Sequence, residues 1–365
     1  MEKIRVLHVV SSLSTGSGIM GVIMNYYRHI DHEKVQFDFL YFIENEITYK
    51  NEINKLGGKF YFLARPSVKN YIKYKNFFKE NENKYKAVHL HEVYLNLFVL
   101  PIAKKYGIKY LITHSHNTKF SDKKLSAIRN RMLCIPIKKQ ANMYFACSKA
   151  AGATLYGQKY VDSGKVIIIN NAIDIDRFRF RPDVRTNMRR ELQINDMFVV
   201  GHIGRFAEQK NHSFLLEIFF EIRKRKANSI LMLVGDGPLF EDIKNKAKKL
   251  GIKDSVMFLG RKSNVEDYLQ AMDVFVLPSL FEGSPVAGVE AQASGLPCFF
   301  SNSITNEIDI INSTFASISI EAKKWAELIL EYTTNFTRTD TYDYIESANF
   351  NIKKEADKLF NYYNS

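Results

Sequence analysis

The sequence is poor in cysteine, and the few cysteines it has lie far apart. They are Cys134, Cys147 and Cys298, and they form no CxxC pair and no spacing typical of a metal site. An odd number of separated thiols argues against a disulfide framework. We therefore expect free cysteines in or near a core.

Long apolar runs are missing too. No stretch approaches the roughly 18 to 20 residues that a membrane-spanning helix needs. The N-terminal letters MEKIRVLHVV enter a strand pattern without the apolar core of a signal peptide. The sequence also has no internal repeat and no low-complexity segment. These absences predict a globular protein that is made and kept in the cytoplasm.

Positive charge is what the sequence has in excess. Lys and Arg number 52 against 39 Asp and Glu, which gives a formal net charge of +13 over 365 residues. The excess favours an anionic partner, which could be nucleic acid, an anionic membrane face or a phosphorylated substrate. The length exceeds one ordinary core and predicts two domains of about 170 to 180 residues.

The first half alternates strand-like and helical segments. An apolar run at residues 4–10 leads through a loop with Gly16, Ser17 and Gly18 into an amphipathic pattern at 19–28, the opening of a Rossmann-like unit. Such alternation predicts a parallel sheet with helices on both faces and a site at the carboxyl ends of its strands. The other strand-like runs are residues 37–42, 59–63, 87–91, 110–114 and 143–147.

Histidines gather at two of these strand ends. His114 and His116, followed by Asn117, end one predicted strand, and His89 and His91 end the strand before it. A histidine here can be a structural core residue, or it can line a ligand site. The cluster also raises the alternative of a metal site.

The most distinctive segment of the second half is PSLFEGSPVAGVEAQASGLP at residues 278–297. Glu282 lies in a loop of small residues after a predicted strand at 274–277. Pro285 can occupy the first turn of a helix that ends at residue 294, which places Glu290 about two turns in. A carboxylate beside the N–H groups of a helix start suits a sugar diphosphate. By spacing alone, the two glutamates can equally be solvated surface acids.

Two basic residues five positions apart follow a predicted strand at residues 198–203. Arg205 and Lys210 come directly after Gly204, on the loop to the next helix. There the Arg fork and the Lys ammonium can both bind one phosphate group. The alternative is an exposed loop with two solvated cations.

Together these motifs resemble those of retaining glycosyltransferases of the GT-B fold, family GT4. Glu282 and Glu290 match the E-x7-E element of that family, and Arg205 and Lys210 match its diphosphate clamp; Gly235 begins the turn that resembles G-x-G-P. The resemblance covers nearly the whole chain. It implies an α/β protein with two Rossmann-like parallel-sheet domains that face each other across a cleft.

The expected domain bounds follow from the same resemblance. Residues 1–178 form an acceptor-binding domain, residues 179–345 form a nucleotide-sugar-binding domain, and residues 346–365 contain a C-terminal helix that crosses back to the first domain. The sequence VIIINNAIDIDRF at 166–178 resembles the linker of the family.

The resemblance also implies a reaction, the transfer of a sugar with retention from a nucleotide-sugar, with a UDP-sugar favoured, to an acceptor hydroxyl. Arg205 and Lys210 would stabilise the leaving diphosphate, Glu282 would bind sugar hydroxyls and Glu290 ribose hydroxyls. His116, or His114 in the alternative register, would contact the donor sugar or the acceptor. The further donor-side positions are Gly204, Gly235, Arg261, Lys262, Gly283, Ser284, Pro285 and Val286; the acceptor-side positions are Gly16, Ser17, Gly18, His114 and Asn117.

The resemblance implies that the departing phosphate oxygen accepts the proton of the acceptor, so no protein base is expected. No cofactor is expected either. GT-B enzymes usually need no metal, and no Asp-x-Asp element stands in a strand context. Gly283, Ser284 and Pro285 replace the frequent G-F-G of the family, so the identity of the sugar does not carry over.

The overall pattern is similar to bacterial enzymes that build capsule, exopolysaccharide or O-antigen on a polyprenyl-diphosphate lipid. It implies a lipid-linked saccharide acceptor, a peripheral place at the inner face of the cytoplasmic membrane and no nucleic-acid partner. Basic stretches with embedded apolar residues at 65–79 and 119–139 fit either solvated helix faces or an anionic membrane surface. Two other classes stay open: a GT-B-shaped sugar-nucleotide epimerase or phosphorylase, and a non-enzymatic basic protein that binds lipid or nucleic acid.

Overall fold

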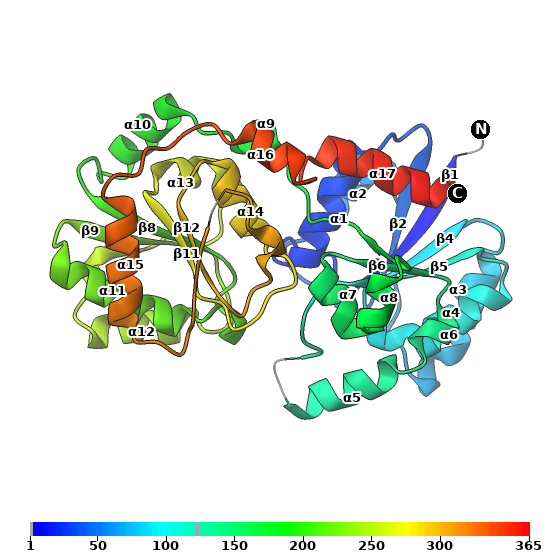
Figure 1. Cartoon of the computed structure of the whole chain (residues 1–365). Coiled ribbons are helices and arrows are strands. Elements are labelled where there is room, and N and C mark those ends of the chain that lie inside the picture. Colours follow the sequence, from blue (N-terminus) through cyan, green and yellow to red (C-terminus); the bar gives the residue numbers. More distant parts are fainter. Residues whose placement is uncertain (1–2, 122–123, 312) are drawn as a thin grey trace. The chain divides into compact units, whose positions relative to one another are not determined.

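Strands and helices alternate along almost the whole chain and build two α/β units (Figure 1). The structure is a computed structural model and describes residues 3–121, 124–311 and 313–365. The first unit contains the chain up to Ala172 together with Ile352–Ser365, and the second contains Ile173–Asn351.

The first unit is built on a seven-stranded parallel sheet in the order β3-β2-β1-β4-β5-β6-β7. All residues of β2 are buried, as in a parallel strand that is covered on both faces. The strands are β1 (Ile4–Val9), β2 (Val35–Tyr41), β3 (Phe60–Phe62), β4 (Ala87–Leu90), β5 (Tyr110–Ser115), β6 (Met143–Ala146) and β7 (Val166–Ile168).

Helices cover both faces of this sheet. Leu7 and Val9 of β1 pack into a cluster with α3 and α4, whereas His8 points to the opposite face, because successive residues of a strand alternate. The helices are α1 (Gly18–His29), α2 (Lys50–Lys55), α3 (Tyr71–Glu80), α4 (Asn96–Lys105), α5 (Lys124–Cys134), α6 (Ile137–Gln140), α7 (Lys149–Tyr156), α8 (Gln158–Asp162) and α17 (Ile352–Asn364).

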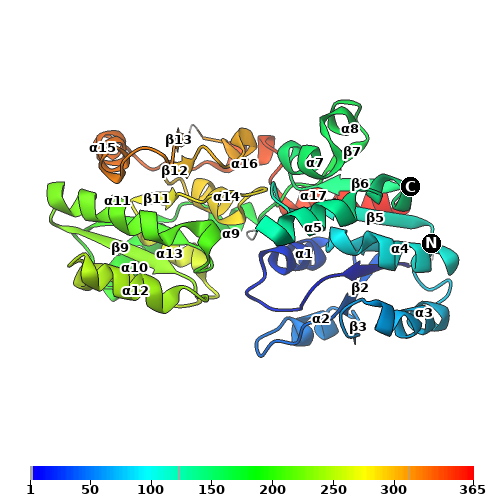
Figure 2. The same cartoon turned by 90° about the horizontal axis from the view of Figure 1, so that it is seen from below.

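The C-terminal helix α17 belongs to the first unit and lies beside α1 (Figure 1 and Figure 2). Lys358 on this helix donates from Nζ to the carbonyl oxygen of Ile168, at 3.0 Å. Leu359 and Tyr363 are buried against the sheet. The last helix therefore completes the cover of one face of this sheet.

The second unit has a six-stranded parallel sheet in the order β10-β9-β8-β11-β12-β13. Its strands are β8 (Phe198–Ile203), β9 (Ser229–Val234), β10 (Val256–Phe258), β11 (Val274–Leu277), β12 (Cys298–Ser301) and β13 (Thr314–Ala316). Its helices are α9 (Ile175–Phe178), α10 (Pro182–Glu191), α11 (His212–Arg225), α12 (Phe240–Lys249), α13 (Val265–Ala271), α14 (Val286–Ala293), α15 (Ala322–Thr333) and α16 (Tyr342–Ser347).

Two hydrophobic clusters form the core of this unit, one on each face of the sheet. Val199 packs in one cluster and Val200 in the other. The second cluster contains the single Trp325, which is fully buried on α15 and donates from its indole nitrogen to the Ser317 carbonyl at 2.9 Å. Both strand patterns and both layers of helices agree with the expected parallel α/β architecture.

The boundaries between the units differ by a few residues from the expected positions at 178 and 345. Ile175 and Phe178 are buried in the core of the second unit, and so are Ile345 and Phe350. The short helix α9 and the turn after α16 therefore belong to the second unit. The segment that was expected to be only a linker also begins with the edge strand β7.

All three cysteines are buried. Among the residues that the structure describes, no helix combines the length and the apolar character needed to cross a membrane.

Candidate functional site

In the second unit the strand order reverses between β8 and β11. Ligands of open parallel sheets bind at such a reversal, beyond the carboxyl ends of the strands. The loop after β8 carries Arg205 and Lys210, and the loop after β11 carries Glu282. The structure thus brings the predicted clamp and the first predicted glutamate to the same edge of the sheet.

These two loops are joined by side-chain and backbone contacts. The Lys210 ammonium lies 2.7 Å from a carboxylate oxygen of Glu282, and both side chains are largely buried. Gln209 donates to the other carboxylate oxygen of Glu282 at 3.2 Å and to the Phe281 carbonyl at 3.0 Å. The Leu280 N–H donates to the Gln209 carbonyl at 2.8 Å. A charge pair at this depth needs such additional partners, because both ions have lost most of their water.

Arg205 differs from Lys210 in being exposed. The backbone on either side of Arg205, at Gly204 and Phe206, packs closely against Gly235 and Gly237. Gly235 has a φ of 142°, and a Cβ there would lie 2.0 Å from the Gly204 carbonyl oxygen. A Cβ on Gly237 would lie 2.6 Å from the Phe206 carbonyl oxygen. The turn at residues 235–238 therefore supports the loop of Arg205 through backbone contact, and no larger residue fits there.

The turn after β10 contributes Gly260, which contacts Gly235 through the backbone. The Gly235 N–H donates to the Gly260 carbonyl at 2.9 Å, and the Gly204 N–H donates to the Val234 carbonyl at 3.0 Å. Arg261 and Lys262 follow and are both exposed. Arg261 lies 3.8 Å from the Asp236 carboxylate in a solvated pair. The predicted donor-side residues of three adjacent strands thus share one edge of the sheet.

Helix α14 begins one residue later than expected. Pro285 is its N-cap, with φ −71° and ψ 111°, and the helix runs from Val286 to Ala293. Gly283, Ser284 and Pro285 are buried, and Val286 is half-buried. The backbone at the start of this helix is therefore held in place by packing.

Glu290 lies in the second turn of α14. Burial raises the pKa of its carboxyl to about 7, although the nearby Arg177 guanidinium opposes this rise. Arg177 is itself shared with Glu266, whose carboxylate lies 2.7 Å away. A carboxyl with this pKa is protonated in part at neutral pH, so it can either donate or accept a hydrogen bond.

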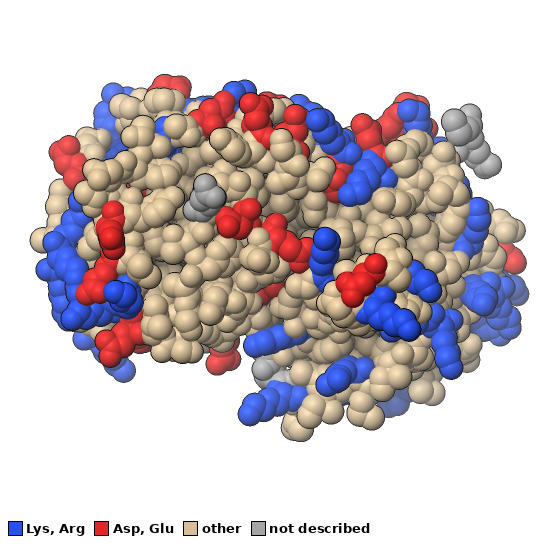
Figure 3. All heavy atoms as spheres, in the orientation of Figure 1, with Lys and Arg blue, Asp and Glu red and all other residues tan. Residues whose placement is uncertain are grey.

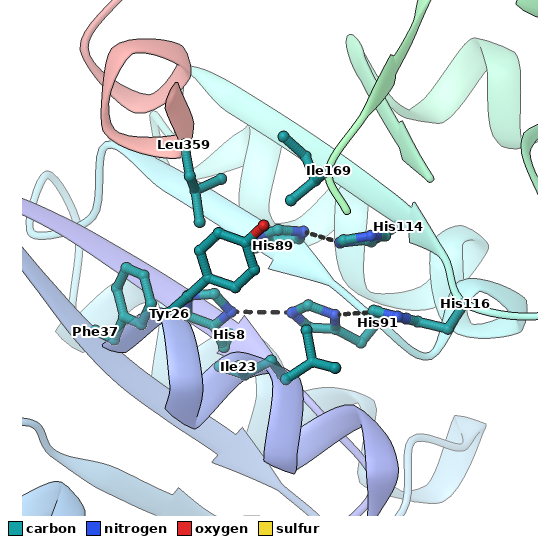
Figure 4. Close-up of a pocket in the computed structure, with 11 residues that line it drawn as sticks. His8, Ile23, Tyr26, Phe37, His89, His91, His114, His116, Ile169 and Leu359 are labelled. Atoms are coloured by element: carbon teal, nitrogen blue, oxygen red, sulfur yellow. Dashed lines mark hydrogen bonds between the residues drawn. The ribbon is translucent and has the colours of Figure 1, made fainter. Parts of the chain in front are cut away.

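In the first unit the strand order reverses between β1 and β4. Five histidine side chains from β1, β4, β5 and the residues that follow them meet there, on the face that α1 and α17 cover (Figure 4). The sheet register explains the cluster: His8 is the partner of His89, and residues two apart in a strand share a face. The five are His8, His89, His91, His114 and His116.

The imidazoles form two hydrogen-bonded chains (Figure 4). In the first, His8 Nδ1 lies 2.9 Å from His91 Nε2, and His91 Nδ1 lies 2.7 Å from His116 Nε2. In the second, the Tyr363 hydroxyl lies 2.7 Å from His89 Nδ1, and His89 Nε2 lies 3.1 Å from His114 Nδ1. All except His116 are buried, and His116 is half-buried.

Burial keeps these histidines neutral. It lowers the pKa of His8 and of His116 to about 3, and it lowers the pKa of His89, His91 and His114 well below the usual value, with repulsion between the rings as a smaller cause. A cavity of about 20 Å³ lies among the rings, and its surface is apolar, so it offers a water molecule too few polar partners. Its other walls are Val22, Ile23, Tyr26, Phe37, Ile169 and Leu359.

Of this cluster, the sequence alone indicated His89, His91, His114 and His116 but missed His8 and Tyr363. His8 lies inside the apolar run IRVLHVV, and this context indicates a core residue of a strand. The pattern His-x-His, repeated at the ends of two strands, places all four of its imidazoles on one face. A polar residue in the neighbouring buried strand β1 was the remaining signal.

The other predicted acceptor-side residues have mostly local roles. The Ser17 hydroxyl caps α1 by accepting from the Met20 N–H at 3.3 Å. The Gly16 N–H donates to the Ser14 hydroxyl at 3.2 Å. A Cβ on Gly18 would meet nothing within 4 Å. Asn117 is exposed beside His116.

Comparison with known proteins gives one consistent family. Residues 184–342 match the model described as "Glycosyl transferases group 1". EpsF of Bacillus subtilis (strain 168), assigned as a glycosyltransferase, is 35% identical over 337 residues, which cover 89% of this chain and 86% of that one. An Escherichia coli protein named UDP-Gal:alpha-D-GlcNAc-diphosphoundecaprenol alpha-1,3-galactosyltransferase is 29% identical over 248 residues, 66% of this chain and 63% of that one.

Solved structures share the fold at lower identity. The crystal structure of Anabaena HepE in complex with UDP and glucose superposes with a TM-score of 0.80 at 16% identity, over 99% of this chain and 100% of that one. A TarM variant of S. aureus, solved with UDP among its ligands, gives a TM-score of 0.72 at 12% identity, over 99% and 100% of the two chains.

Proposed function

The chain belongs to the group 1 glycosyl transferases and has the GT-B fold, and we propose that it moves a sugar with retention from a UDP-sugar to an acceptor hydroxyl. The observation that carries this proposal is the contact of Lys210 with Glu282, beside the exposed Arg205, at the strand reversal of the second unit. One loop supplies cations for a diphosphate, and the other supplies a carboxylate for hydroxyls.

In this reaction the bond between the anomeric carbon and the diphosphate oxygen breaks, and a bond from that carbon to the acceptor oxygen forms. Arg205 and Lys210 stabilise the negative charge that grows on the leaving diphosphate. The departing phosphate oxygen takes the proton of the acceptor hydroxyl on the same face of the sugar. The proposed mechanism therefore needs no protein base, and it needs neither a metal nor a cofactor.

The glutamates orient the donor. A carboxylate has several acceptor sites, so Glu282 can accept a hydrogen bond from a sugar hydroxyl while it stays paired with Lys210. Glu290, with its pKa near 7, binds the ribose hydroxyls in this proposal. Arg261 and Lys262 face solvent, so we assign their part in donor binding to the backbone of that turn.

We further propose a saccharide on a polyprenyl diphosphate as the acceptor, in the synthesis of a bacterial surface polysaccharide. The name of the Escherichia coli relative describes a diphosphoundecaprenol acceptor, and CapH of Staphylococcus aureus, 25% identical over 290 residues, is named for capsular polysaccharide biosynthesis. Such an acceptor is held in a membrane, and the first unit offers a surface for one.

That surface is helix α5 with the turn after it, which we call the α5 face. Leu125, Ile128 and Met132 lie on one side of the helix and are 84%, 59% and 64% exposed; Ile135, just beyond it, is 76% exposed. The opposite side anchors the helix through the buried residue Asn130, whose amide donates to the Phe120 carbonyl at 2.9 Å.

Basic residues surround the apolar stripe of the α5 face. Figure 3 shows Lys and Arg side chains at the edge of the first unit where α5 lies. The exposed cations on α5 are Lys124, Arg129 and Arg131, and the exposed Lys138 and Lys139 follow on α6. An apolar stripe among cations matches the headgroup region of an anionic membrane. In the other basic stretch, Tyr74, Phe77 and Phe78 are buried in the core, whereas Val68, Tyr71 and Ile72 are exposed.

The donor is tested by a thermal-shift screen of UDP, GDP, ADP and their sugar conjugates. A ligand at 100 times its Kd adds about 2.7 kcal/mol of stability. We expect UDP and a UDP-sugar to shift the native protein but not the Arg205→Ala, Lys210→Ala variant. Arg190→Ala is the matched control, since Arg190 is an exposed cation on α10 of the same unit. A variant that still responds to UDP like the native protein would remove the clamp from the proposal.

A further inference from the structure

The two imidazole chains of the first unit are more elaborate than a substrate contact by His116 alone requires. The described residues also leave one nitrogen without a partner at the buried end of each chain, His8 Nε2 and His114 Nε2. These two nitrogens are buried and belong to neutral rings of the cluster. They therefore limit where the protons of the cluster can lie.

A metal is the first alternative, since two groups of three histidines have nitrogens close together: His8, His89 and His91, and His91, His114 and His116. The orientation of the rings argues against it. The rings of His114 and His116 stack 4.0 Å apart at 22°, and those of His89 and His91 stack 4.3 Å apart at 23°. Lone pairs lie in the ring planes, so stacked rings direct them side by side rather than toward one ion. Among the described residues, no carboxylate lines the cavity to balance a dication.

Hydrogen-bonded neutral rings fit the same geometry. A neutral imidazole has one donor and one acceptor nitrogen, so a chain of them has only two possible proton arrangements. In the first, protons lie on the Nδ1 atoms of His8, His91 and His116, and His8 Nε2 is a bare acceptor in the apolar cavity. In the second, they lie on the Nε2 atoms, and His8 Nε2 becomes a buried N–H without a partner.

The first arrangement is favoured, because buried orphan N–H groups are rarer in proteins than buried orphan acceptors. His8 then donates a hydrogen bond from Nδ1 to His91, and His91 donates one from Nδ1 to His116. The Nε2 of His116 accepts from His91, and its Nδ1 carries a proton. The half-buried His116 is the end of the chain at which a ligand can approach.

We infer that His91, with His8 behind it, is a positioning residue that holds His116 in the Nδ1–H form, so that His116 donates a hydrogen bond to a ligand oxygen. In that form His116 cannot take a proton from the acceptor, because its only acceptor nitrogen is occupied by His91. The inference rests on the proposed function for the identity of the ligand, a sugar hydroxyl or a phosphate oxygen, but the proton positions do not depend on it.

The proton positions are measured directly by long-range ¹H–¹⁵N NMR of the imidazoles in the ligand-free protein. We expect a protonated Nδ1 and an unprotonated Nε2 for His8, His91 and His116 at neutral pH. A protonated Nε2 on His116, averaging between the two forms, or a charged ring would overturn the inference, even if the protein proves to be a glycosyltransferase. So would stoichiometric, tightly bound Zn²⁺ that displaces the signals of the five rings.

Two substitutions at one position separate positioning from folding. His91→Asn retains an amide that can donate to His116 from near the position of Nδ1, whereas His91→Leu removes the donor. We expect His91→Leu to lower kcat about tenfold with little change in the KM for the donor, and His91→Asn to restore most of it. Equal losses of kcat in both variants would argue against the positioning role of His91. If His91→Leu does not fold, the NMR spectrum of the native protein still decides.

Discussion

Lys210 and Glu282 neutralise each other at the strand reversal of the second unit, with 2.7 Å between the ammonium and the carboxylate. Their side chains are only 16% and 9% exposed, so each depends on the other for most of its charge balance. Both are also the residues that the proposed reaction uses. The pair therefore links the stability of the second unit to its ability to bind a donor.

This link predicts that Lys210→Ala destabilises the protein as well as inactivating it. Removal of one partner leaves the other as a buried charge, which costs up to about 3 kcal/mol in the free energy of unfolding. We expect the double variant with Glu282→Gln to lose less than the sum of the two single losses. Urea unfolding of the four proteins gives the coupling energy directly. Additive losses would mean that the contact contributes little.

Arg205 is the contrasting case, because it is exposed and stands on a loop that backbone contacts already hold. Arg205→Ala should change the free energy of unfolding by less than about 0.5 kcal/mol. It should lower kcat by about 10² to 10³, the usual cost of removing one donor to a developing negative charge. Steady-state kinetics and urea unfolding of the same preparation measure both. A large loss of stability would show that Arg205 has a structural role.

Gly235 provides a test of the loop that presents Arg205. A Cβ at this position would lie 2.0 Å from the Gly204 carbonyl oxygen, so Gly235→Ala must displace that loop. We expect a loss of about 2 kcal/mol or more in stability and a weaker shift with UDP. Gly251→Ala is the matched control, since Gly251 also has a positive φ, of 70°, but no atom within 4 Å of its Cβ position. Equal effects would assign the loss to backbone strain alone.

Much of this architecture follows from apolar runs and the turns that bound them. The strands β8 and β11 have the bounds that the sequence predicts, and the helix predicted from Pro285 to residue 294 differs from α14 by one residue at each end. The edge strands β7 and β13, of three residues each, were missed.

The placement of the candidate site was predictable where a motif and the sheet topology coincide, since the loops of Arg205, Lys210 and Glu282 lie at one edge of the sheet. The pairing of Lys210 with Glu282 was not, because it depends on how two loops far apart in the sequence meet. The histidine chains were missed for a similar reason. His8 and Tyr363 join the cluster only through the register of β1 with β4 and the return of α17.

The buried histidines predict that the protein loses stability in acid. The pKa of His8 is about 3 and that of His202 about 4 in the folded state, because burial disfavours their charged forms. In the unfolded chain both are near 6.5. Above that pH neither state binds a proton, and below it only the unfolded state does. Stability should therefore fall as pH falls from about 6.5 toward 3, with each histidine adding up to about 1.4 kcal/mol per pH unit.

Burial raises the pKa of Glu355 and of Glu290, so these two carboxyls act in the opposite direction, as Glu290 illustrates. Its folded pKa of about 7 lies above the unfolded value of about 4.3, so its destabilising effect is relieved as pH falls through that window. The histidines outnumber these two carboxyls, and the net slope should follow the histidines. The free energy of unfolding can be measured from pH 7.5 to 5. Its slope against pH should be smaller in His8→Phe by about the contribution of one bound proton. An unchanged slope would place the proton uptake elsewhere.

The α5 face should bind anionic vesicles through its apolar stripe and its cations together. Leu125 and Ile135 are 84% and 76% exposed, and replacing both with Ser removes apolar surface that insertion would bury. We expect at least about a tenfold weaker partition into phosphatidylglycerol vesicles. Arg131→Glu should weaken binding by about 1 kcal/mol or more at low salt and less at high salt.

The control for this experiment is Ile47→Ser, because Ile47 is 62% exposed in the same unit but stands near Glu44 and Glu46 rather than among cations. Co-sedimentation with phosphatidylglycerol and with phosphatidylcholine vesicles separates the charge contribution from the apolar one. The Leu125, Ile135 variant should keep its thermal shift with UDP, since the donor residues lie in the other unit. It should lose activity on a lipid-linked acceptor but not on a soluble analogue. Native-like binding to anionic vesicles by this variant would exclude the α5 face as the membrane contact.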